Sequence, residues 1–415
     1  MFIRSAALSL AITLGLALCS SSVALETTSR VTQTAGGNAA ARTQLVRKLS
    51  AALANAKIHS AQRGAEVVDL ATGEVVFSKH SRGSLAPASN EKLPITLAAL
   101  TLLGSEYRIS TEVLGEGEQQ GSEWLGNLVL KGYGDPDLST ADLQRLARRV
   151  RAAGIRSVSG SLIADESYFD RHRTAPGWKS SFLINECAPL SALSIDRGRV
   201  TSASPPLVAA SAFVKALAAS GVKVRGRLRA GVASDEASSL ASVKSPSLWK
   251  LLRFMNRESD NYTAELLLKQ IGAYDKGRGT TANGAVEVRS VLADAGISLA
   301  GVRIVDGSGL SRLDRLTPEA LSQLLVDVWS DSTLRRPFVG SLAIAGRVGT
   351  LSHRMRWRPT LGNVYAKTGT TSSASALSGY VRTRYAFVIL QNGNPVSVDQ
   401  AHVAQDRFAT VLAEQ

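Results

Sequence analysis

Cysteine is scarce in this sequence, which holds only Cys19 and Cys187 among its 415 residues. Removal of an N-terminal leader that includes Cys19 would leave Cys187 alone, which excludes an internal disulfide in the remaining chain. A single cysteine is either a reactive thiol or a small buried hydrophobic residue, and the second case is the more common. We therefore expect Cys187 to be buried and unreactive.

Histidine is also sparse and carries no recognisable pattern. The five histidines show no spacing typical of metal ligands: His59, His80, His172, His353 and His402. No Gly-x-Ser-x-Gly nucleophile motif is present, and the stretch DGSGLSR at residues 306–312 lacks the Gly-Lys pair of a phosphate-binding loop. The sequence therefore predicts neither a metal nor a cofactor.

Long apolar runs are confined to the N-terminus. Arg4 precedes an uncharged apolar run at 6–18, and Ser22-Val23-Ala24 follows it. This order is typical of a signal peptide, here residues 1–24, and the run is too short for a stable transmembrane helix. We predict export to the periplasm or cell envelope. Lipidation of Cys19 is an alternative, although a bulky leucine precedes this cysteine where lipoprotein signals carry a small residue.

Acidic residues are outnumbered, since 34 Asp and Glu face 48 Lys and Arg, for a net charge of +14. The basic residues are scattered, with no arginine-rich tract and no basic motif interleaved with aromatics, so we expect no nucleic-acid partner. Two interpretations remain open: a solvated basic surface, or attraction to an anionic wall polymer or membrane surface.

The first hundred residues predict a lead-in followed by a helix, a hairpin and a second helix. Residues 25–42 are rich in Thr, Ser, Gly and Ala, which favours a flexible segment. Leucines at four-residue spacing predict an amphipathic helix over 42–57. Two apolar strands within 65–80 flank a turn at 71–74. A polar loop then leads to an apolar helix that begins near Ser89.

The rest of the chain divides into an α/β stretch and a stretch of helices followed by strands. Short strands at 126–132 and 159–165 alternate with a helix at 140–154, and this pattern continues to about residue 240. Helices are predicted on both sides of a charged break within 248–272. More helices follow at 280–296 and 317–330. Strands at 363–370, 374–383 and 385–393 precede a last helix at 398–414, and we expect both chain ends to share one sheet.

Three short motifs occur in a definite order. Ser-x-x-Lys occurs at Ser89-Asn90-Glu91-Lys92, but also at Ser220/Lys223 and Ser247/Lys250, so it is weak alone. Ser259-Asp260-Asn261 is the only Ser-x-Asn, and Lys367-Thr368-Gly369 is the only Lys-Thr-Gly. Penicillin-binding proteins and class A β-lactamases carry this ordered set, so the whole is far more specific than its parts.

Each motif has a chemical and a structural interpretation. A serine nucleophile needs a base within hydrogen-bond reach, and Ser89 and Lys92 would share one helix face. Lys92 must then be neutral, which burial and a nearby cation such as Lys367 would favour. The structural alternative for Ser89 is a helix N-cap. Pro94 leaves the local geometry open, because proline is tolerated only in the first turn of a helix.

The other two motifs have similar pairs of interpretations. Ser259 could pass a proton to the leaving amine and Asn261 could hold the substrate amide, or Ser-Asp-Asn is simply a turn. Lys367 and Thr368 could bind a carboxylate while Gly369 permits close backbone approach, or the motif is a strand end.

An oxyanion hole would complete this site. The backbone N–H groups of Ser89 and Thr370 would form it, since paired N–H groups can stabilise the charge of a tetrahedral intermediate.

The chain resembles the D-alanyl-D-alanine carboxypeptidase/endopeptidases of the low-molecular-mass class C penicillin-binding proteins, which are related to the S13 serine peptidases. The resemblance covers nearly the whole chain after the leader. It rests on the three motifs and on the segments DGSGLSR, GRVGTLSHRM (346–355), GYGDPDL (132–138) and PLSALSIDRG (189–198).

The resemblance implies an architecture of the α/β (α+β) class. It implies a serine β-lactamase/transpeptidase-like domain, with an antiparallel sheet flanked by helices plus an all-helical subdomain. This domain would comprise residues 43–109 and 241–415, with a second α/β domain inserted at 110–240. The interval from Lys92 to Ser259 is long enough for that insertion, but family members commonly carry a further small domain there. We expect that further domain to be missing or vestigial.

The resemblance also implies an activity. Ser89 would be the acylated nucleophile, Lys92 its proton acceptor, Ser259 a proton-transfer residue, and Lys367 with Thr368 the carboxylate site. The substrates would be peptidoglycan stem peptides, and β-lactams would inhibit covalently. Two alternatives stay open: a β-lactamase or esterase on the same scaffold, and a wall-binding or β-lactam-sensing protein that is acylated without turnover.

Overall fold

The computed structural model describes residues 40–54, 62–198, 202, 204–274 and 276–415. The predicted signal peptide, with Cys19, and nearly all of the predicted lead-in lie outside these residues. The chain divides into two units between Ser50 and Ala51. A helix runs over residues 40–53, so it begins two residues before the predicted start and ends four residues before the predicted end.

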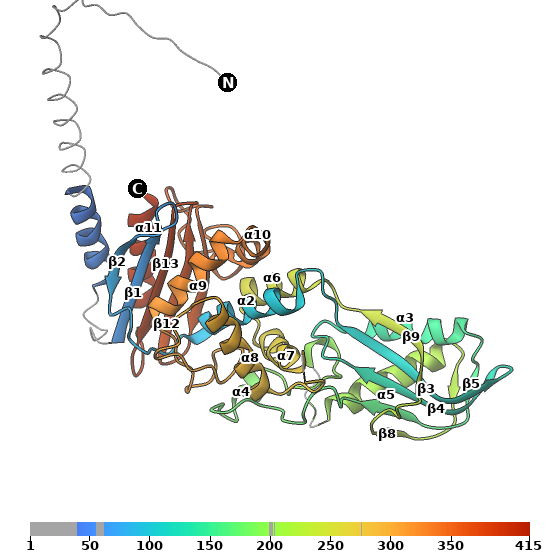
Figure 1. The fold of residues 1–415 in the computed structure, drawn as a ribbon. Coiled ribbons are helices and arrows are strands. Elements are labelled where there is room, and N and C mark those ends of the chain that lie inside the picture. Colours follow the sequence, from blue (N-terminus) through green and yellow to red (C-terminus); the bar gives the residue numbers. More distant parts are fainter. Residues whose placement is uncertain (1–39, 55–61, 199–201, 203, 275) are drawn as a thin grey trace, which may run out of the picture. The chain divides into compact units, whose positions relative to one another are not determined.

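Both ends of the second unit contribute to one antiparallel sheet of six strands, as predicted (Figure 1). Its order is β10-β11-β12-β13-β1-β2. The N-terminal hairpin supplies two strands, and Arg63 of the first pairs with Gln391 near the end of the chain. The strands are β1 (Arg63–Asp69), β2 (Val75–Lys79), β10 (Ala343–Ile344), β11 (Val364–Thr370), β12 (Ala374–Val381) and β13 (Tyr385–Asn392).

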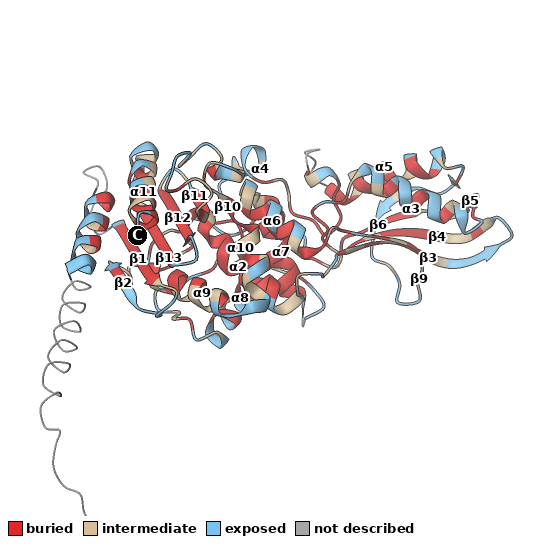
Figure 2. Ribbon diagram, turned by 90° about the horizontal axis from the view of Figure 1, so that it is seen from above, coloured by how far each residue is buried: buried red, intermediate tan, exposed pale blue. Residues whose placement is uncertain are grey.

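Helices cover both faces of this sheet. Side chains alternate between the faces of a strand, so Ser375 and Tyr380 of β12 point in opposite directions. Gln405 of α11 (Val398–Ala413) donates to the Ser375 hydroxyl, whereas the Tyr380 hydroxyl donates to the Leu325 carbonyl of α9 (Pro318–Ser330). The strands between these two helices are buried over almost their whole length (Figure 2).

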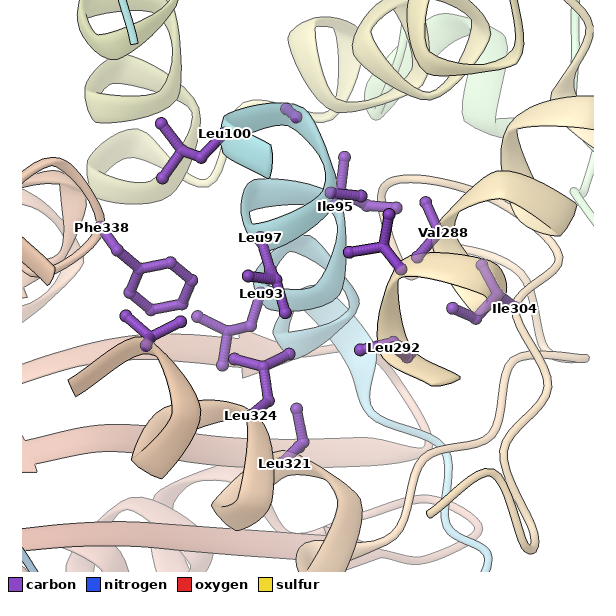
Figure 3. Packing of buried hydrophobic residues seen from close by; sticks show 14 of the residues in the cluster. Leu93, Ile95, Leu97, Leu100, Val288, Leu292, Ile304, Leu321, Leu324 and Phe338 are labelled. Carbon is purple, nitrogen blue, oxygen red and sulfur yellow. The ribbon is translucent and has the colours of Figure 1, made fainter. Parts of the chain in front are cut away.

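The helix α2 (Lys92–Leu103) lies at the centre of a largely helical core (Figure 3). Apart from Lys92 and two threonines its residues are apolar, and nine of its twelve are buried, which is the pattern of an enclosed helix. Leu93, Ile95 and Leu97 pack among side chains of α8 (Thr281–Asp294), α9 and α10 (Ser332–Ser341). This enclosure gives the start of α2 a rigid support. Two more helices pack against α2: α6 (Leu248–Glu258) and α7 (Asn261–Ala273).

A second, mixed sheet of seven strands lies between α2 and α6 in the sequence. A long antiparallel hairpin forms its middle, and parallel pairs extend it. The helices α3 (Thr140–Ala152) and α5 (Pro205–Ala219) share an apolar core with it. The strands are β3 (Ser110–Gln120), β4 (Glu123–Gly132), β5 (Ser157–Val158), β6 (Leu162–Asp165), β7 (Lys223–Val224), β8 (Leu228–Ala230) and β9 (Ser238–Lys244).

The second sheet occupies almost the same residues as the predicted insertion. Its last strand, β9, runs across the predicted boundary after residue 240. The division into two domains and the loss of a third stay predictions. Four short helical turns complete the described structure: η2 (Ala88–Glu91), α4 (Phe182–Asn185), η3 (Asp196–Gly198) and η4 (Gly349–Leu351). Within the described part of the chain, every helix is too short or too polar to cross a lipid bilayer.

Candidate active site

Ser89 lies in a tight turn rather than at a helix cap. It belongs to the 3₁₀ turn η2, and its side chain caps neither this turn nor α2. Ala88, directly before it, has a φ of 48°, a conformation that costs free energy for a residue with a Cβ. Pro94 is the third residue of α2, where a backbone N–H has no partner within the helix, so proline fits there. The N-cap interpretation of Ser89 is therefore wrong.

Lys92 begins α2 and is fully buried. Its Nζ lies 3.1 Å from the Ser89 Oγ, 2.8 Å from the Asn261 Oδ1 and 2.6 Å from the carbonyl oxygen of Ser308. The first and last residues of the Ser-x-x-Lys motif thus touch, as its spacing predicts. Asn261 contacts the lysine directly, a role that the sequence did not indicate.

Burial lowers the pKa of Lys92 to about 8, which makes a neutral amine accessible near physiological pH. The carboxyl groups of Asp306 and Glu265 oppose this shift. Lys367 is also fully buried, and burial together with the charge of Lys92 holds its pKa well below the usual value. Burial is therefore the main cause of the lowered pKa of both lysines. Between the two, it is the charge of Lys92 that lowers the pKa of Lys367.

Ser259 occupies the break between α6 and α7, as the sequence predicts. It ends α6 in the left-handed conformation, with a φ of 58°. Asp260 caps the N-terminus of α7 by accepting from the Thr263 N–H at 2.7 Å. The Lys367 Nζ donates to the Ser259 Oγ at 2.9 Å. The second and third motifs therefore meet through these two side chains.

Strand β11 passes close to the turn η2 at Gly369. A Cβ at Gly369 would lie 2.9 Å from the Pro87 carbonyl oxygen and 3.0 Å from the backbone nitrogen of Ser89. The Thr368 hydroxyl hydrogen-bonds the Thr350 hydroxyl at 2.7 Å. The absence of a side chain at Gly369 is what lets the strand approach the turn.

The three motifs line one cleft of about 320 Å³. Its walls include Ser89, Ser259, Asn261, Thr368 and Thr370. Of the predicted site residues, Lys92, Lys367 and Gly369 lie behind this surface, where the two lysines are buried.

A second cavity, of about 510 Å³, borders the cleft and shares five lining residues with it: Glu186, Gly309, Leu310, Thr370 and Thr371. Its lining includes Lys179, Arg312 and Arg315. Basic side chains therefore line the space next to the three motifs.

Arg197 supports the second motif from outside it. Its guanidinium donates to Asp260 at 3.1 Å and to the Thr263 hydroxyl at 2.9 Å, and it also bonds Asp137 at 2.9 Å. The same group lies over the ring of Phe254, 3.9 Å from its centre. The sequence offered only the segments GYGDPDL and PLSALSIDRG, which contain Asp137 and Arg197, without a role for either residue.

Cys187 is buried and carries a free thiol. Burial, followed by the nearby carboxyl groups of Glu265 and Asp260, raises the pKa of this thiol well above its usual value. A high pKa keeps the sulfur protonated and poorly nucleophilic. The expectation of a buried, unreactive residue therefore agrees with the structure.

Comparison with known proteins places these observations in context. A family model described as the D-Ala-D-Ala carboxypeptidase 3 (S13) family matches residues 45–206 and 199–415. A D-alanyl-D-alanine carboxypeptidase of Actinomadura sp. (strain R39) is 32% identical, with 92% of this chain and 86% of that protein covered. Carboxypeptidase DacB of Mycolicibacterium smegmatis is also 32% identical, with 89% and 84% covered.

Among solved structures, penicillin binding protein 4 of Haemophilus influenzae has a TM-score of 0.77 at 22% identity, with 90% of this chain and 98% of that chain covered. At this identity the likeness concerns the fold. It agrees with the predicted class, an antiparallel sheet flanked by helices on a β-lactamase/transpeptidase-like scaffold. A structure of the same protein complexed with a β-lactam has a TM-score of 0.71.

Proposed function

We propose a function for this chain, which belongs to the D-Ala-D-Ala carboxypeptidase 3 (S13) family. It is a serine D-Ala-D-Ala carboxypeptidase/endopeptidase that acts on peptidoglycan stem peptides through an acyl-Ser89 intermediate. The observation that carries the proposal is the contact of 3.1 Å between Lys92 Nζ and Ser89 Oγ, made by a buried lysine whose pKa is lowered to about 8. This contact supports the pairing of a serine nucleophile with a neutral lysine base.

Acylation begins when the Ser89 Oγ attacks the carbonyl carbon of the penultimate D-alanine and its proton passes to the neutral Lys92. The oxygen of the tetrahedral intermediate would lie between the backbone N–H groups of Ser89 and Thr370. Two backbone donors of this kind act where charge develops. They therefore stabilise the transition state more than the bound substrate.

Collapse of the intermediate breaks the peptide bond, and the leaving amine takes up a proton. Ser259 is suited to deliver that proton, because its hydroxyl contacts Lys367 Nζ at 2.9 Å. The terminal carboxylate of the substrate would lie against Lys367 and Thr368, and such an anion favours the charged form of a lysine. Water then hydrolyses the acyl ester: the proton held on Lys92 returns to the Ser89 oxygen, and the proton that water gives up replaces the one delivered through Ser259.

The same attack would open a β-lactam ring and leave a stable acyl-enzyme. The basic side chains Lys179, Arg312 and Arg315 beside the cleft suit a stem peptide, which carries carboxylates. The N-terminal segment supports export to the periplasm or cell envelope. The net charge of +14 suits either a solvated basic surface or association with an anionic wall or membrane.

Parallel incubations of the mature protein with labelled penicillin and with a pentapeptide ending in D-Ala-D-Ala test this function. We expect label on the Ser89 peptide and release of D-alanine. Absence of label on that peptide would contradict the acyl-enzyme mechanism. Label without D-alanine release would favour a sensor, and rapid loss of label a β-lactamase.

A further inference from the structure

A buried carboxyl group lies beneath the proposed base and is not part of any of the three motifs. Glu265 lies one helical turn after Asn261 on α7 and is fully buried. Its Oε1 accepts hydrogen bonds from the backbone N–H groups of Gly307 at 3.0 Å and Ser308 at 2.8 Å. Gly307 packs so tightly on α7 that a Cβ there would lie 2.5 Å from the carbonyl oxygen of Ala264. The loop is therefore fixed to the helix at this point.

The loop in turn fixes an acceptor for Lys92. The carbonyl oxygen of Ser308 lies 2.6 Å from Lys92 Nζ, and the Oδ1 of Asn261 lies 2.8 Å from it. A neutral amine has two N–H bonds and one lone pair. When these two oxygens take the N–H bonds, the lone pair faces the Ser89 Oγ, the third neighbour, at 3.1 Å. The direction of the base therefore depends on where Ser308 is held.

We propose that Glu265 is a positioning residue for acylation: by holding the N–H groups of Gly307 and Ser308, it fixes the Ser308 carbonyl that turns the Lys92 lone pair toward Ser89. This inference rests on the proposed function, because it takes Lys92 as the base that activates Ser89.

The neighbouring buried acids do not bind the Gly307 and Ser308 N–H groups. Asp306 accepts from the Gly309 and Ser311 N–H groups, both at 2.7 Å, and from the Trp178 indole at 2.8 Å. It also accepts from the Ser308 hydroxyl at 3.2 Å, so it holds the side chain of Ser308 rather than the backbone N–H groups. Glu91 is fully buried beside Lys92, but neither of its oxygens has a hydrogen-bond partner in the described structure. Glu91 is therefore a matched control: a buried carboxyl near Lys92 without a hold on the loop.

The protonation state of Glu265 decides which variant is informative. Burial, followed by the charge of Asp306, raises the pKa of Glu265 to about 8. A glutamine is isosteric with the protonated acid and keeps an oxygen for the two N–H groups, whereas alanine removes it. Six charged or titratable groups interact electrostatically with Lys92 or with each other across this pair of lysines: Glu91, Cys187, Asp260, Glu265, Asp306 and Lys367.

The experiment compares Glu265→Gln, Glu265→Ala and Glu91→Gln with the wild type. For each protein, the rate constant of acylation by a labelled β-lactam and the dissociation constant of the preceding complex are measured separately across pH. Thermal unfolding shows whether each variant is folded. We expect Glu265→Ala to lose acylation rate on the order of 100-fold, since small misplacements of reacting groups cost that much. The dissociation constant should change little.

Glu265→Gln and Glu91→Gln should acylate within a few-fold of the wild type at neutral pH. In Glu265→Gln the rate should reach its plateau at a lower pH, because a carboxylate that raises the pKa of Lys92 is gone. Equal losses in Glu265→Gln and Glu265→Ala would overturn positioning in favour of charge alone. Unchanged acylation in a folded Glu265→Ala would also overturn it. A wild type that is not acylated at all would refute the proposed function instead.

Discussion

At the residue scale, the order of three motifs singled out Ser89 from three serines with the same local pattern. The contact of Lys92 with Ser89 agrees with the spacing of the motif. The contact of Lys367 with Ser259 was not predicted. The Ser308 carbonyl and Glu265 were not predictable in this way. A backbone oxygen carries no side-chain signature, and a buried glutamate reads in the sequence as one polar residue of a helix.

Lys92→Ala should abolish acylation and leave the fold intact. The loss should be on the order of 10²–10⁴-fold, because a general base contributes about that much. Mass spectrometry of the penicillin-treated protein measures the acyl adduct, and circular dichroism serves as the control for folding. Acylation at the wild-type rate would remove Lys92 from the role of base.

The rate of acylation should rise with pH through about 8, the lowered pKa of Lys92. Below this value the amine is protonated and has no lone pair for the Ser89 proton. Above it the rate should level off. Stopped-flow acylation with a chromogenic β-lactam, at saturating concentration, measures this rise of the rate with pH. A rate independent of pH between about 6 and 9 would contradict the assignment.

Gly369→Ala should slow acylation and destabilise the protein by about 1–3 kcal/mol, the usual cost of overpacking. The added Cβ would lie 3.0 Å from the Ser89 nitrogen and 2.9 Å from the Pro87 oxygen, so β11 and the turn must separate. Gly340→Ala in α10 is the control, because its Cβ would meet nothing closer than 3.6 Å. Chemical denaturation and acylation rates are compared for both, and equal behaviour would count against the close approach.

At the element scale, the break between α6 and α7 matters most for the site. The sequence predicted two helices with a charged interruption, and the structure places the end of α6 at Glu258 and the start of α7 at Asn261. The sequence did not predict that Arg197, 63 residues before Asp260, would hydrogen-bond to Asp260 in that break. Such a contact joins segments distant in sequence, and local propensity contains no information about it.

Asp260→Ala should weaken this break. The variant loses the cap on the Thr263 N–H and the partner of Arg197, so stability should fall by about 1–2 kcal/mol. Acylation should fall as well, because Ser259 and Asn261 flank the substituted residue. Asp260→Asn keeps an acceptor for Thr263 and should lose less. The free energy of unfolding in urea is the measurement, and an alanine variant as stable as the asparagine variant would contradict the capping role.

At the scale of the whole molecule, several buried acids from different parts of the chain gather near one site. Burial raises the pKa values of Glu91, Glu265 and Asp314 above their ordinary range, to about 8 for Glu265. The sequence predicted the sheet that joins both chain ends and the general class of the fold. It could not predict this cluster, because these three acids and Asp306 lie in three separate segments and come together only in the folded core.

These acids predict a pH dependence of stability. Between their ordinary and their raised pKa values the native state holds more protons than the unfolded chain, so stability falls as pH rises through that window. The midpoint of thermal unfolding should therefore be lower at pH of about 8 than at about 5.5. In Glu91→Gln the side chain at position 91 cannot ionise, so the midpoint of thermal unfolding should fall less over the same pH interval. An identical fall in the variant would show that Glu91 does not contribute.

The pairing of β1 with β13 also constrains how the protein is made. Arg63 and its neighbours can complete their sheet only when residues near Gln391 have been synthesised. Lys367 and Gly369 leave the ribosome in the same late interval. A nascent chain therefore contains Ser89 long before it contains strand β11, which packs beside that serine. The proposed active site is therefore completed last, after nearly the whole polypeptide exists. A truncated product that ends before β11 would contain Ser89 but would lack Lys367 and Gly369.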